Sequence, residues 1–304
     1  MRGLGTLLRS CLAVFAVLAV VVACQDYRNA LGPDLREPPE YSLRLSTYNV
    51  HYIVTMQAEG RWSPAGWDAR KEPMARAVEA LDADIIAFQE METFSGGNND
   101  DNNLTREFLL EQFPELSAGA VGDWRSFPST QPIFFRISRF ELLDQGWFFF
   151  SETPDVIYSR TFNGSYPAYA TWAVFRARQG GATFRVVNLH TDYESRENRA
   201  RSIDLVARHT EPWIADGETV FVVGDFNARL GSDLHRRLED EGLTFVPVQG
   251  ATYHLDRGLN LFGAIDHIAY TRAEPVGAPM VLREKFGEVW PTDHYPVVAD
   301  FKLE

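Results

Sequence analysis

The stretch Phe221-Val222-Val223-Gly224-Asp225-Phe226-Asn227 has the character of a buried strand that ends by presenting a carboxylate and an amide. Its β-branched and aromatic residues suit a strand that is covered on both faces. Gly224 interrupts the run and lets the backbone turn. If the strand geometry continues, Asp225 and Asn227 project to the same side at the carboxyl end of the strand, where open α/β layers place their chemistry. The alternative is an ordinary turn, which Asp and Asn also favour.

Further strands and helices are predicted on both sides of this stretch. Strand patterns occupy residues 43–50, 84–90, 133–136, 140–143, 172–177, 183–188, 264–270 and 296–302, and helical patterns occupy residues 67–81, 104–113 and 197–215. We expect 133–136 and 140–143 to pair as a hairpin, and 172–177 to pair with 183–188 across a Gly-Gly turn. The Gly- and Asn-rich residues 95–103 are predicted to form an exposed loop. Strands that alternate with helices and hairpins favour a layered α/β fold.

The amino terminus has the pattern of a secretory signal over residues 1–23. Two arginines precede an apolar run from Cys11 to Ala23, which is too short to span a bilayer. Cys24 follows this run directly and resembles the lipidated Cys of the bacterial lipobox, although an ordinary signal peptide cut elsewhere is the alternative. Residues 24–41 are predicted to be a lipidated tether, and residues 42–304 to be the domain. The expected location is therefore outside the cytoplasm, anchored at the outer membrane or cell surface.

Composition limits the partners of the domain. The chain has 304 residues, is 45% hydrophobic and carries a net charge of −13, so a substantial core is expected. Without residues 1–23 it keeps 27 basic and 42 acidic side chains, a net charge of −15. Nucleic-acid backbones favour basic surfaces, so tight binding of duplex DNA is not favoured. A local patch such as Arg196, Arg199 and Arg201 could nevertheless suffice.

Polar side chains collect where the predicted strands end. They are Asn49, Glu90, His190, Asp192, Asp225, Asn227, Asp266, His267, Asp293 and His294. Any one of them has an ordinary explanation as a cap, a turn or a satisfied core group. Together they are hard to attribute to turns, because carboxylate and amide oxygens suit Mg²⁺ or Mn²⁺ and histidines can stabilise or protonate an anion. The combination indicates metal-assisted attack of water on a phosphate.

Six motifs carry a family resemblance. They are Ser46–Val50, Asp84–Glu90, Asn188–His190, Gly224–Asn227, Ile265–Ile268 and Thr292–Val297. In this order they resemble the endonuclease/exonuclease/phosphatase superfamily, which includes deoxyribonuclease I, exonuclease III, bacterial sphingomyelinases and inositol polyphosphate 5-phosphatases. The resemblance covers about residues 43–303. It implies a four-layer α/β sandwich, in which two packed mixed β-sheets are flanked by helices, with the site at one edge.

The resemblance also implies roles for the acidic and amide residues. Glu90 resembles the principal ligand of a divalent metal, Mg²⁺ or Mn²⁺. Asn49 is similar to the residue that helps place the metal or the phosphate, and Asp293 to a further metal or water ligand. Asp225 resembles the acid that orients or deprotonates the attacking water. Asn227 resembles a donor to the phosphate in the transition state.

Two histidines are implied to flank the scissile phosphate, His190 and His294. Asp266 resembles the carboxylate that orients His294, and such a pair fixes the imidazole tautomer and raises its pKa. Two weaker substrate-binding candidates complete the prediction. Asp192 lies two residues beyond His190, and His254 belongs to a Thr-Tyr-His element that resembles a Thr-Phe-His element in some branches of the superfamily.

The predicted function is a metal-dependent phosphoric ester hydrolase that uses activated water on a phosphodiester or phosphomonoester. A secreted nuclease of the same fold is one alternative, and a phospholipase C or sphingomyelinase-like activity is another, which a membrane anchor would suit. A catalytically inactive binding protein is a third, but every main site position is filled. The expected partners are the phosphoester substrate and the membrane, through Cys24, and the protein is expected to be a monomer.

Overall fold

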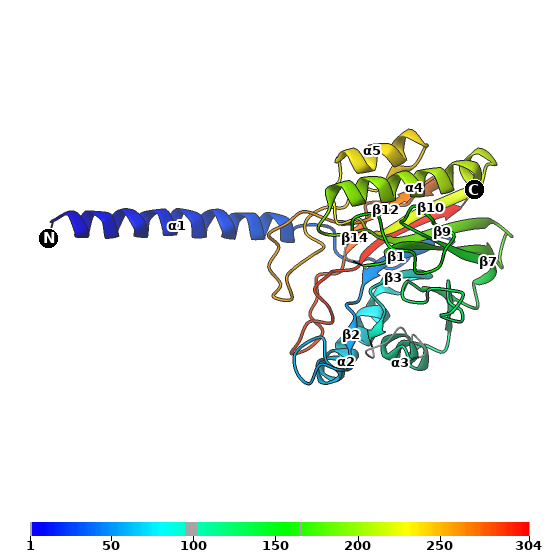
Figure 1. Cartoon of the computed structure of the whole chain (residues 1–304), viewed down its shortest axis with the longest axis horizontal. Helices are drawn as coiled ribbons and strands as arrows, with labels where there is room; N and C mark the ends of the chain where they lie inside the picture. Colours follow the sequence, from blue (N-terminus) through cyan, green and yellow to red (C-terminus); the bar gives the residue numbers. More distant parts are fainter. Residues whose placement is uncertain (1, 95–101, 165, 304) are drawn as a thin grey trace.

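Two mixed β-sheets pack face to face and helices cover their outer sides, in the computed structural model of residues 2–94, 102–164 and 166–303 (Figure 1). The first sheet has the strand order β13 (Ala273–Pro275), β15 (Val297–Leu303), β1 (Leu43–Asn49), β3 (Ile85–Gln89), β6 (Ile133–Arg136) and β5 (Leu116–Gly119), with β14 (Met280–Val281) also paired to β15. The second has the order β11 (Thr244–Phe245), β12 (Asp266–Tyr270), β10 (Thr219–Asp225), β9 (Thr183–His190), β8 (Tyr169–Ala177) and β7 (Phe140–Phe149). The predicted sandwich is confirmed.

The helices lie in two outer layers, one for each sheet. Helices α2 (Pro64–Leu81) and α3 (Leu104–Gln112) cover the first sheet, and α4 (Arg196–Ala215) and α5 (Asp233–Asp240) cover the second (Figure 1). Asn103 caps α3 by accepting a hydrogen bond from the backbone N–H of Arg106 at 3.0 Å. The predicted loop 95–103 falls mostly on residues 95–101, which lie outside the described residues. A small parallel pair, β2 (Ile53–Val54) and β4 (Thr93–Phe94), flanks the first sheet.

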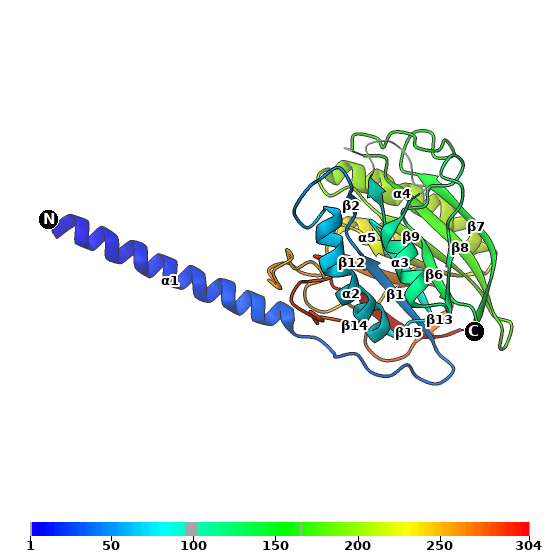
Figure 2. The ribbon, with the colours of Figure 1, turned by 90° about the horizontal axis from the view of Figure 1, so that it is seen from below.

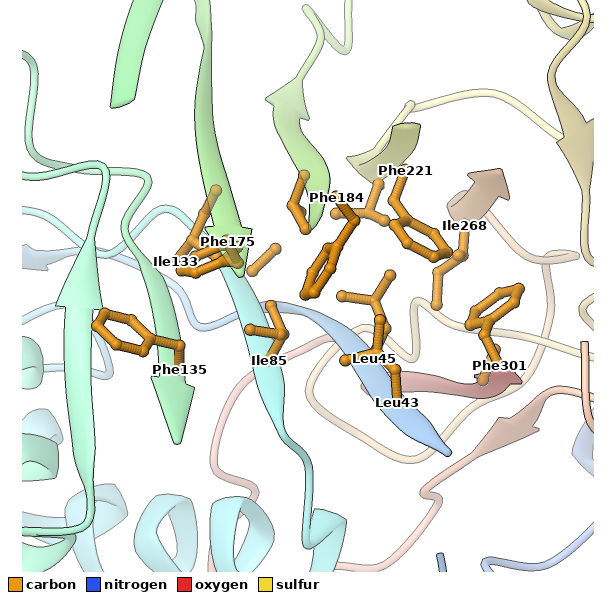
Figure 3. Close-up of a cluster of buried hydrophobic side chains, with 14 of the residues drawn as sticks. Leu43, Leu45, Ile85, Ile133, Phe135, Phe175, Phe184, Phe221, Ile268 and Phe301 are labelled. Carbon is orange, nitrogen blue, oxygen red and sulfur yellow. The ribbon is translucent and has the colours of Figure 1, made fainter. Parts of the chain in front are cut away.

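The space between the sheets holds the largest hydrophobic cluster. Leu45 and Ile85 reach into it from the first sheet, and Phe184, Phe221 and Ile268 from the second (Figure 3). Each such side chain contributes about 1.5–3 kcal/mol by leaving water. Strand β10 is covered on both faces, which explains why its sequence is apolar with few interruptions.

Gly224 is required by the close approach of neighbouring backbone. Strand β10 pairs in parallel with β9 and antiparallel with β12. At Gly224 the φ angle is 143°, and an added Cβ would lie 1.9 Å from the carbonyl oxygen of Leu189. Only glycine fits a position that combines positive φ with such contact. The motif therefore keeps β9 and β10 close just before both strands deliver polar side chains.

The predicted hairpin of 133–136 with 140–143 is wrong. Strand β6 pairs with β3 and β5 in the first sheet, whereas β7 pairs with β8 in the second. The short connection crosses between the sheets, and Phe135 and Phe140 both enter the cluster between them. Local pattern could not separate the two outcomes, because either one buries the same apolar side chains.

The amino-terminal segment forms one long helix, α1 (Arg2–Ala30), which projects away from the domain (Figure 2). Because the helix continues past Ala23, its stretch Cys11–Ala30 is long and apolar enough to cross a membrane, although a signal sequence passes the same test. The expectation that the apolar run is too short to span therefore does not hold for the helix. Cys24 is exposed on it.

The segment predicted as a tether lies against the domain. The carbonyl oxygen of Asn29 accepts a hydrogen bond from the backbone N–H of Ala251 at 2.8 Å, and the Asp26 carboxylate accepts one from the backbone N–H of Asn260 at 2.5 Å. Farther along, Arg36 forms an ion pair with Asp300 at 2.8 Å. The end of α1 is thus held beside the 250–263 loop.

Candidate active site

Polar side chains from both sheets meet at one edge of the sandwich. Strands β1 and β3 run parallel, as do β9 and β10, so their carboxyl ends lie together. Strands β12 and β15 run antiparallel to these neighbours and begin where they end. The strand ends bring together Asn49, Glu90, His190, Asp225, Asp266 and His294.

One carboxylate oxygen stands at the centre of this group. Oδ2 of Asp225 lies 3.2 Å from Nδ2 of Asn49, 3.6 Å from Nε2 of His190 and 3.8 Å from Nε2 of His294. Its other oxygen, Oδ1, accepts a hydrogen bond from the backbone N–H of Asn227 at 2.8 Å. Asp225 is buried, so a proton donor, an acceptor or a cation placed here acts in a medium of low dielectric constant.

Asn49 joins the two sheets at this point. Its Nδ2 also donates to Oε1 of Glu90 at 3.0 Å, and its Oδ1 accepts a hydrogen bond from the backbone N–H of His51. In this orientation the amide holds two carboxylates together and does not present its oxygen to a cation. Glu90 follows β3 with a φ angle of 56°, and its Oε1 lies 3.8 Å from Nε2 of His190.

His294 is paired with a carboxylate on the adjacent strand. Its Nδ1 lies 3.0 Å from Oδ2 of Asp266 and 3.3 Å from Oδ1. Burial alone would lower the pKa of His294, but the negative charges of Asp266, Asp225 and Asp293 raise that pKa to about 10. The imidazole is therefore a cation at neutral pH, with Nε2 directed towards Asp225 and available to an anionic oxygen.

Burial acts on the central carboxylates in the opposite sense. It raises the pKa of Asp225, and the nearby charge of Asp266 adds to that effect, while His294 and His190 oppose it. Burial also raises the pKa of Glu90, with His190 opposing. A cation among these oxygens would favour the charged forms and remove the cost of burying them.

The donor set fits a divalent cation. Ligand atoms from Asp225, Asp266 and His294 all lie within 4.8 Å of one another, but the protonated His294 is paired with Asp266, which leaves the Asp225 carboxylate for a cation. Glu90 is held next to Asp225, because Nδ2 of Asn49 donates hydrogen bonds to both carboxylates. Carboxylate oxygens are the ligands that Mg²⁺ and Mn²⁺ prefer.

Asp293 lies at the margin of this group. Burial alone would raise its pKa, but His294, His51 and Arg61 together lower it, so the carboxylate is charged. Its charge also raises the pKa of Glu90. Oγ1 of Thr292 lies 3.3 Å from Oδ1 of Asp293 and 2.9 Å from the carbonyl oxygen of Asn49, which connects Asp293 to the end of β1. The predicted role as a further metal or water ligand stays a prediction.

Asn227 does not continue the strand. Strand β10 ends at Asp225, and Asn227 has a φ angle of 46°, so the condition for both side chains to project to one side of a strand is not met. Its Nδ2 donates to the carbonyl oxygen of Thr191 at 2.9 Å. The turn nevertheless keeps Asn227 next to the central carboxylate through its backbone N–H.

The two weaker candidates occupy structural positions. The Asp192 carboxylate is buried and accepts hydrogen bonds from the backbone N–H groups of Glu194 and Ser195 at 2.9 and 2.8 Å, which shapes the turn before α4. His254 is buried and stacks on Tyr295 at a ring-centroid distance of 4.1 Å. Burial lowers the pKa of His254 to about 4, so its ring is neutral.

Two tyrosines at this edge escaped the sequence reasoning. Tyr253 forms a β-bridge with His294, and their ring centroids are 5.0 Å apart. The Tyr166 ring lies 6.1 Å from that of His190, and its hydroxyl is buried with no hydrogen-bond partner among the described residues. The Thr-Tyr-His element pointed to the right loop, but neighbouring side chains there face different ways. Tyr166 had no local signal, because it precedes β8 by only a few irregular residues.

Two packed mixed sheets with an acidic and histidine-rich edge define a phosphoesterase-like α/β sandwich. The chain belongs to the Endonuclease/Exonuclease/phosphatase family, whose model matches residues 46–294. A comparison with curated proteins returned no relative.

Solved structures share the fold. An endonuclease/exonuclease/phosphatase family protein from Bacteroides thetaiotaomicron has 23% identity and a TM-score of 0.72, over 88% of this chain and all (100%) of that one. A mannosyl-6-phosphatase from the same organism has 24% identity and a TM-score of 0.72, over 86% of this chain and 99% of that one. The human nocturnin catalytic domain, with a bound sulfate anion, has 17% identity and a TM-score of 0.58, over 88% and 96% of the two chains. At these identities the likeness establishes the fold.

Proposed function

We propose that this protein is a divalent-metal-dependent phosphoesterase that cleaves a small phosphoester by attack of water. The observation that carries the proposal is the shared Asp225 carboxylate, with Asn49, His190 and His294 all within 3.8 Å of one of its oxygens. A buried carboxylate between two imidazoles can hold a water molecule and accept its proton. An imidazolium backed by Asp266 can bind an anionic phosphate oxygen.

The residues divide the chemistry between them. Asp225 orients the attacking water and takes up its proton. His294 donates a charge-assisted hydrogen bond to the phosphate, and Nε2 of His190, which lies near the same oxygen of Asp225, donates a second hydrogen bond. Glu90 and Asp225 would hold Mg²⁺ or Mn²⁺, with Asn49 keeping the two carboxylates in place. When bound, such an ion neutralises charge that develops on the phosphoryl oxygens.

A phosphomonoester is the favoured substrate class. The mannosyl-6-phosphatase of similar fold acts on a sugar phosphate by its name, which supports a small head group over a polymer. The net charge of −13 also disfavours a backbone-tracking nuclease, because each phosphate contact on DNA normally uses a cation.

We place the enzyme outside the cytoplasm, anchored through lipid on Cys24. The exposed position of Cys24 on an apolar helix supports this location. The end of that helix contacts the 250–263 loop, which also carries Tyr253 beside His294. The catalytic edge would therefore lie on the anchor side of the domain, within reach of substrates presented at a membrane.

Hydrolysis by the purified full chain tests the proposal, measured as phosphate release from the phosphomonoester and as formation of the cleaved products from the other substrates. The panel comprises a sugar phosphomonoester, a small phosphodiester, phospholipid vesicles, RNA and plasmid DNA, each with Mg²⁺, with Mn²⁺ and with chelator. Asp225→Asn is expected to lower kcat about 10²- to 10⁴-fold, the range for loss of general acid–base catalysis. Asp240→Asn, an exposed carboxylate on α5, is the matched control. Undiminished hydrolysis in chelator, or by Asp225→Asn, would contradict the mechanism.

A further inference from the structure

An arginine-lined hollow of about 340 Å³ lies next to the candidate active site. Its wall includes Asn227, whose backbone N–H contacts the central Asp225 carboxylate at 2.8 Å. The charged side chains that line it are Arg196, Arg199, Arg229 and Asp233. The first two lie in the first turn of α4, and Arg229 lies two residues after Asn227. The hollow thus opens from the same turn that ends β10.

The charge of this hollow opposes that of the protein. Three guanidinium groups against one carboxylate give it a local charge of about +2, in a chain of net charge −13. The sequence grouped Arg196 and Arg199 with Arg201, but the structure separates them. Arg201 pairs with Glu152 and lies over the Phe162 ring at 3.8 Å, and it does not line the hollow. Arg229, from the segment after β10, lines the hollow instead.

The guanidinium groups keep donors free for a ligand. Nη1 of Arg199 is fixed by the carbonyl oxygens of Asp192 and Tyr193 at 2.8 and 2.9 Å. Its Nε is buried and finds no hydrogen-bond partner in the described part of the chain. Arg229 makes no hydrogen bond or ion pair with any described residue. Nη2 of Arg199 and the guanidinium of Arg229 have no partner among the described residues, so they can donate to an anion in the hollow.

Asp233 does not cancel the positive charge. Its Oδ2 lies 3.1 Å from Nη2 of Arg196, and its Oδ1 pairs with Arg236 on the same helix. The carboxylate is therefore shared between two arginines, and both Arg199 and Arg229 stand outside this pairing. Planar guanidinium groups bind phosphate and carboxylate with two parallel hydrogen bonds.

We propose that this hollow is a subsite for a second anionic group, a phosphate or a carboxylate, on the same substrate whose phosphoester bond meets Asp225. The proposal rests on the proposed phosphoesterase function. A substrate of this kind would pass over Asn227, with the scissile phosphate between His190 and His294 and the second anion on Arg199 and Arg229. The preferred substrate would then be a small phosphoester that carries a second anionic group, rather than the phosphate ester of an alcohol without one.

Two matched substrate pairs test the subsite and identify the anion. Fructose 1,6-bisphosphate against fructose 6-phosphate differs by one phosphate. 3-Phosphoglycerate against glycerol 3-phosphate differs by one carboxylate. Wild-type full chain is expected to prefer the doubly anionic member of at least one pair by about tenfold in kcat/KM, equivalent to about 1.4 kcal/mol. The pair with the larger ratio names the anion.

Substitutions of the arginines test whether the hollow causes that preference. Arg229→Gln, and separately Arg199→Gln, are expected to bring the ratio towards one. Arg229→Gln is the cleaner of the two, because Arg199 also holds the turn at residues 192 and 193. Arg201→Gln, on the same helix but outside the hollow, is the matched control and should keep the wild-type ratio. A wild-type ratio near one in both pairs, or an unchanged ratio in Arg229→Gln, overturns the subsite while leaving the proposed function intact.

A binding measurement separates the subsite from the catalytic function. If wild-type protein hydrolyses none of the four compounds, the proposed function fails for small phosphomonoesters. Calorimetric titration of fructose 1,6-bisphosphate then decides the subsite alone. Weaker binding to Arg229→Gln than to Arg201→Gln supports it, and equal affinity for the two variants overturns it.

Discussion

Replacing Asp266 by Asn should shift the pH range in which the enzyme works. In the wild-type protein, Asp266 accepts a hydrogen bond from Nδ1 of His294 at 3.0 Å, and its charge is the main influence that raises the pKa of His294 to about 10 against the effect of burial. The amide keeps the shape and removes the charge. The pKa of His294 should then fall towards its ordinary value of about 6.5, because burial favours the neutral ring.

The size of the effect follows from the fraction of His294 that stays protonated. At about pH 8 the wild-type ring is almost fully protonated, whereas a ring with a pKa of about 6.5 is protonated in roughly one molecule in thirty. If the imidazolium is the active form, kcat/KM falls about thirtyfold, equivalent to about 2 kcal/mol. The loss should shrink as the pH is lowered, because acid restores the proton.

The assay is kcat/KM for the best substrate between about pH 5.5 and 9.5, with saturating Mg²⁺. Wild-type activity should persist on the alkaline side, and Asp266→Asn should lose its alkaline limb first. His294→Gln provides the comparison, since it has no imidazole to titrate. The double variant should be little worse than His294→Gln alone, because the pair acts as one unit. A loss in Asp266→Asn that is equal at every pH, or fully additive with His294→Gln, would refute the reasoning.

The remaining predictions concern the metal, the anchor, the fold and the substrate. Glu90→Gln should raise the Mg²⁺ concentration needed for half-maximal activity by about tenfold or more, measured by titration after chelator treatment, and an unchanged requirement would remove Glu90 from the metal site. Cys24→Ser should abolish incorporation of labelled fatty acid, and continued labelling would contradict lipidation. Gly224→Ala should destabilise the fold by about 3 kcal/mol or more in urea, because its Cβ would lie 1.9 Å from the Leu189 carbonyl oxygen, whereas Gly180→Ala, with open space around it, should cost about 1 kcal/mol. At about 0.15 M ionic strength, kcat/KM should be higher for a small or membrane-presented phosphoester than for plasmid DNA, and plasmid nicking that is tenfold faster would favour a nuclease.

Local pattern sufficed for most of the strands and helices that position the site. The strand at β10 is a continuous apolar run because both of its faces are buried, and the helix at α4 has apolar residues at helical spacing because one face is buried. Short elements such as α5 (Asp233–Asp240) and β5 (Leu116–Gly119) were missed, because a few residues carry too little periodic signal. The pairing of β6 was wrong because partner choice depends on which sheet offers a free edge.

Residue chemistry predicted, before any coordinates, that polar side chains would gather at the strand ends. His190 and Asp225 end strands β9 and β10, and His294 precedes β15. The parallel and antiparallel pairing of the strands brings these ends to one edge. The position of each motif relative to its strand therefore predicts where the site lies, because the direction of a strand determines which of its ends is at this edge of the sheet. The same reasoning could not tell Asn49 as a clamp on two carboxylates from Asn49 as a ligand, because that depends on which side of the amide turns inward.

The sequence by itself determined the family, through the resemblance of six motifs, and the layered fold, through residue patterns at strand and helix spacing. Tertiary structure alone decided which of the predicted polar residues have a structural role, and which residues far apart in the sequence lie together. Asp192 shapes a turn and His254 packs against Tyr295. Arg229, which follows β10, lines the same hollow as Arg199 of α4. Side-chain direction and contact between remote segments set these outcomes, and neither leaves a periodic trace in the chain.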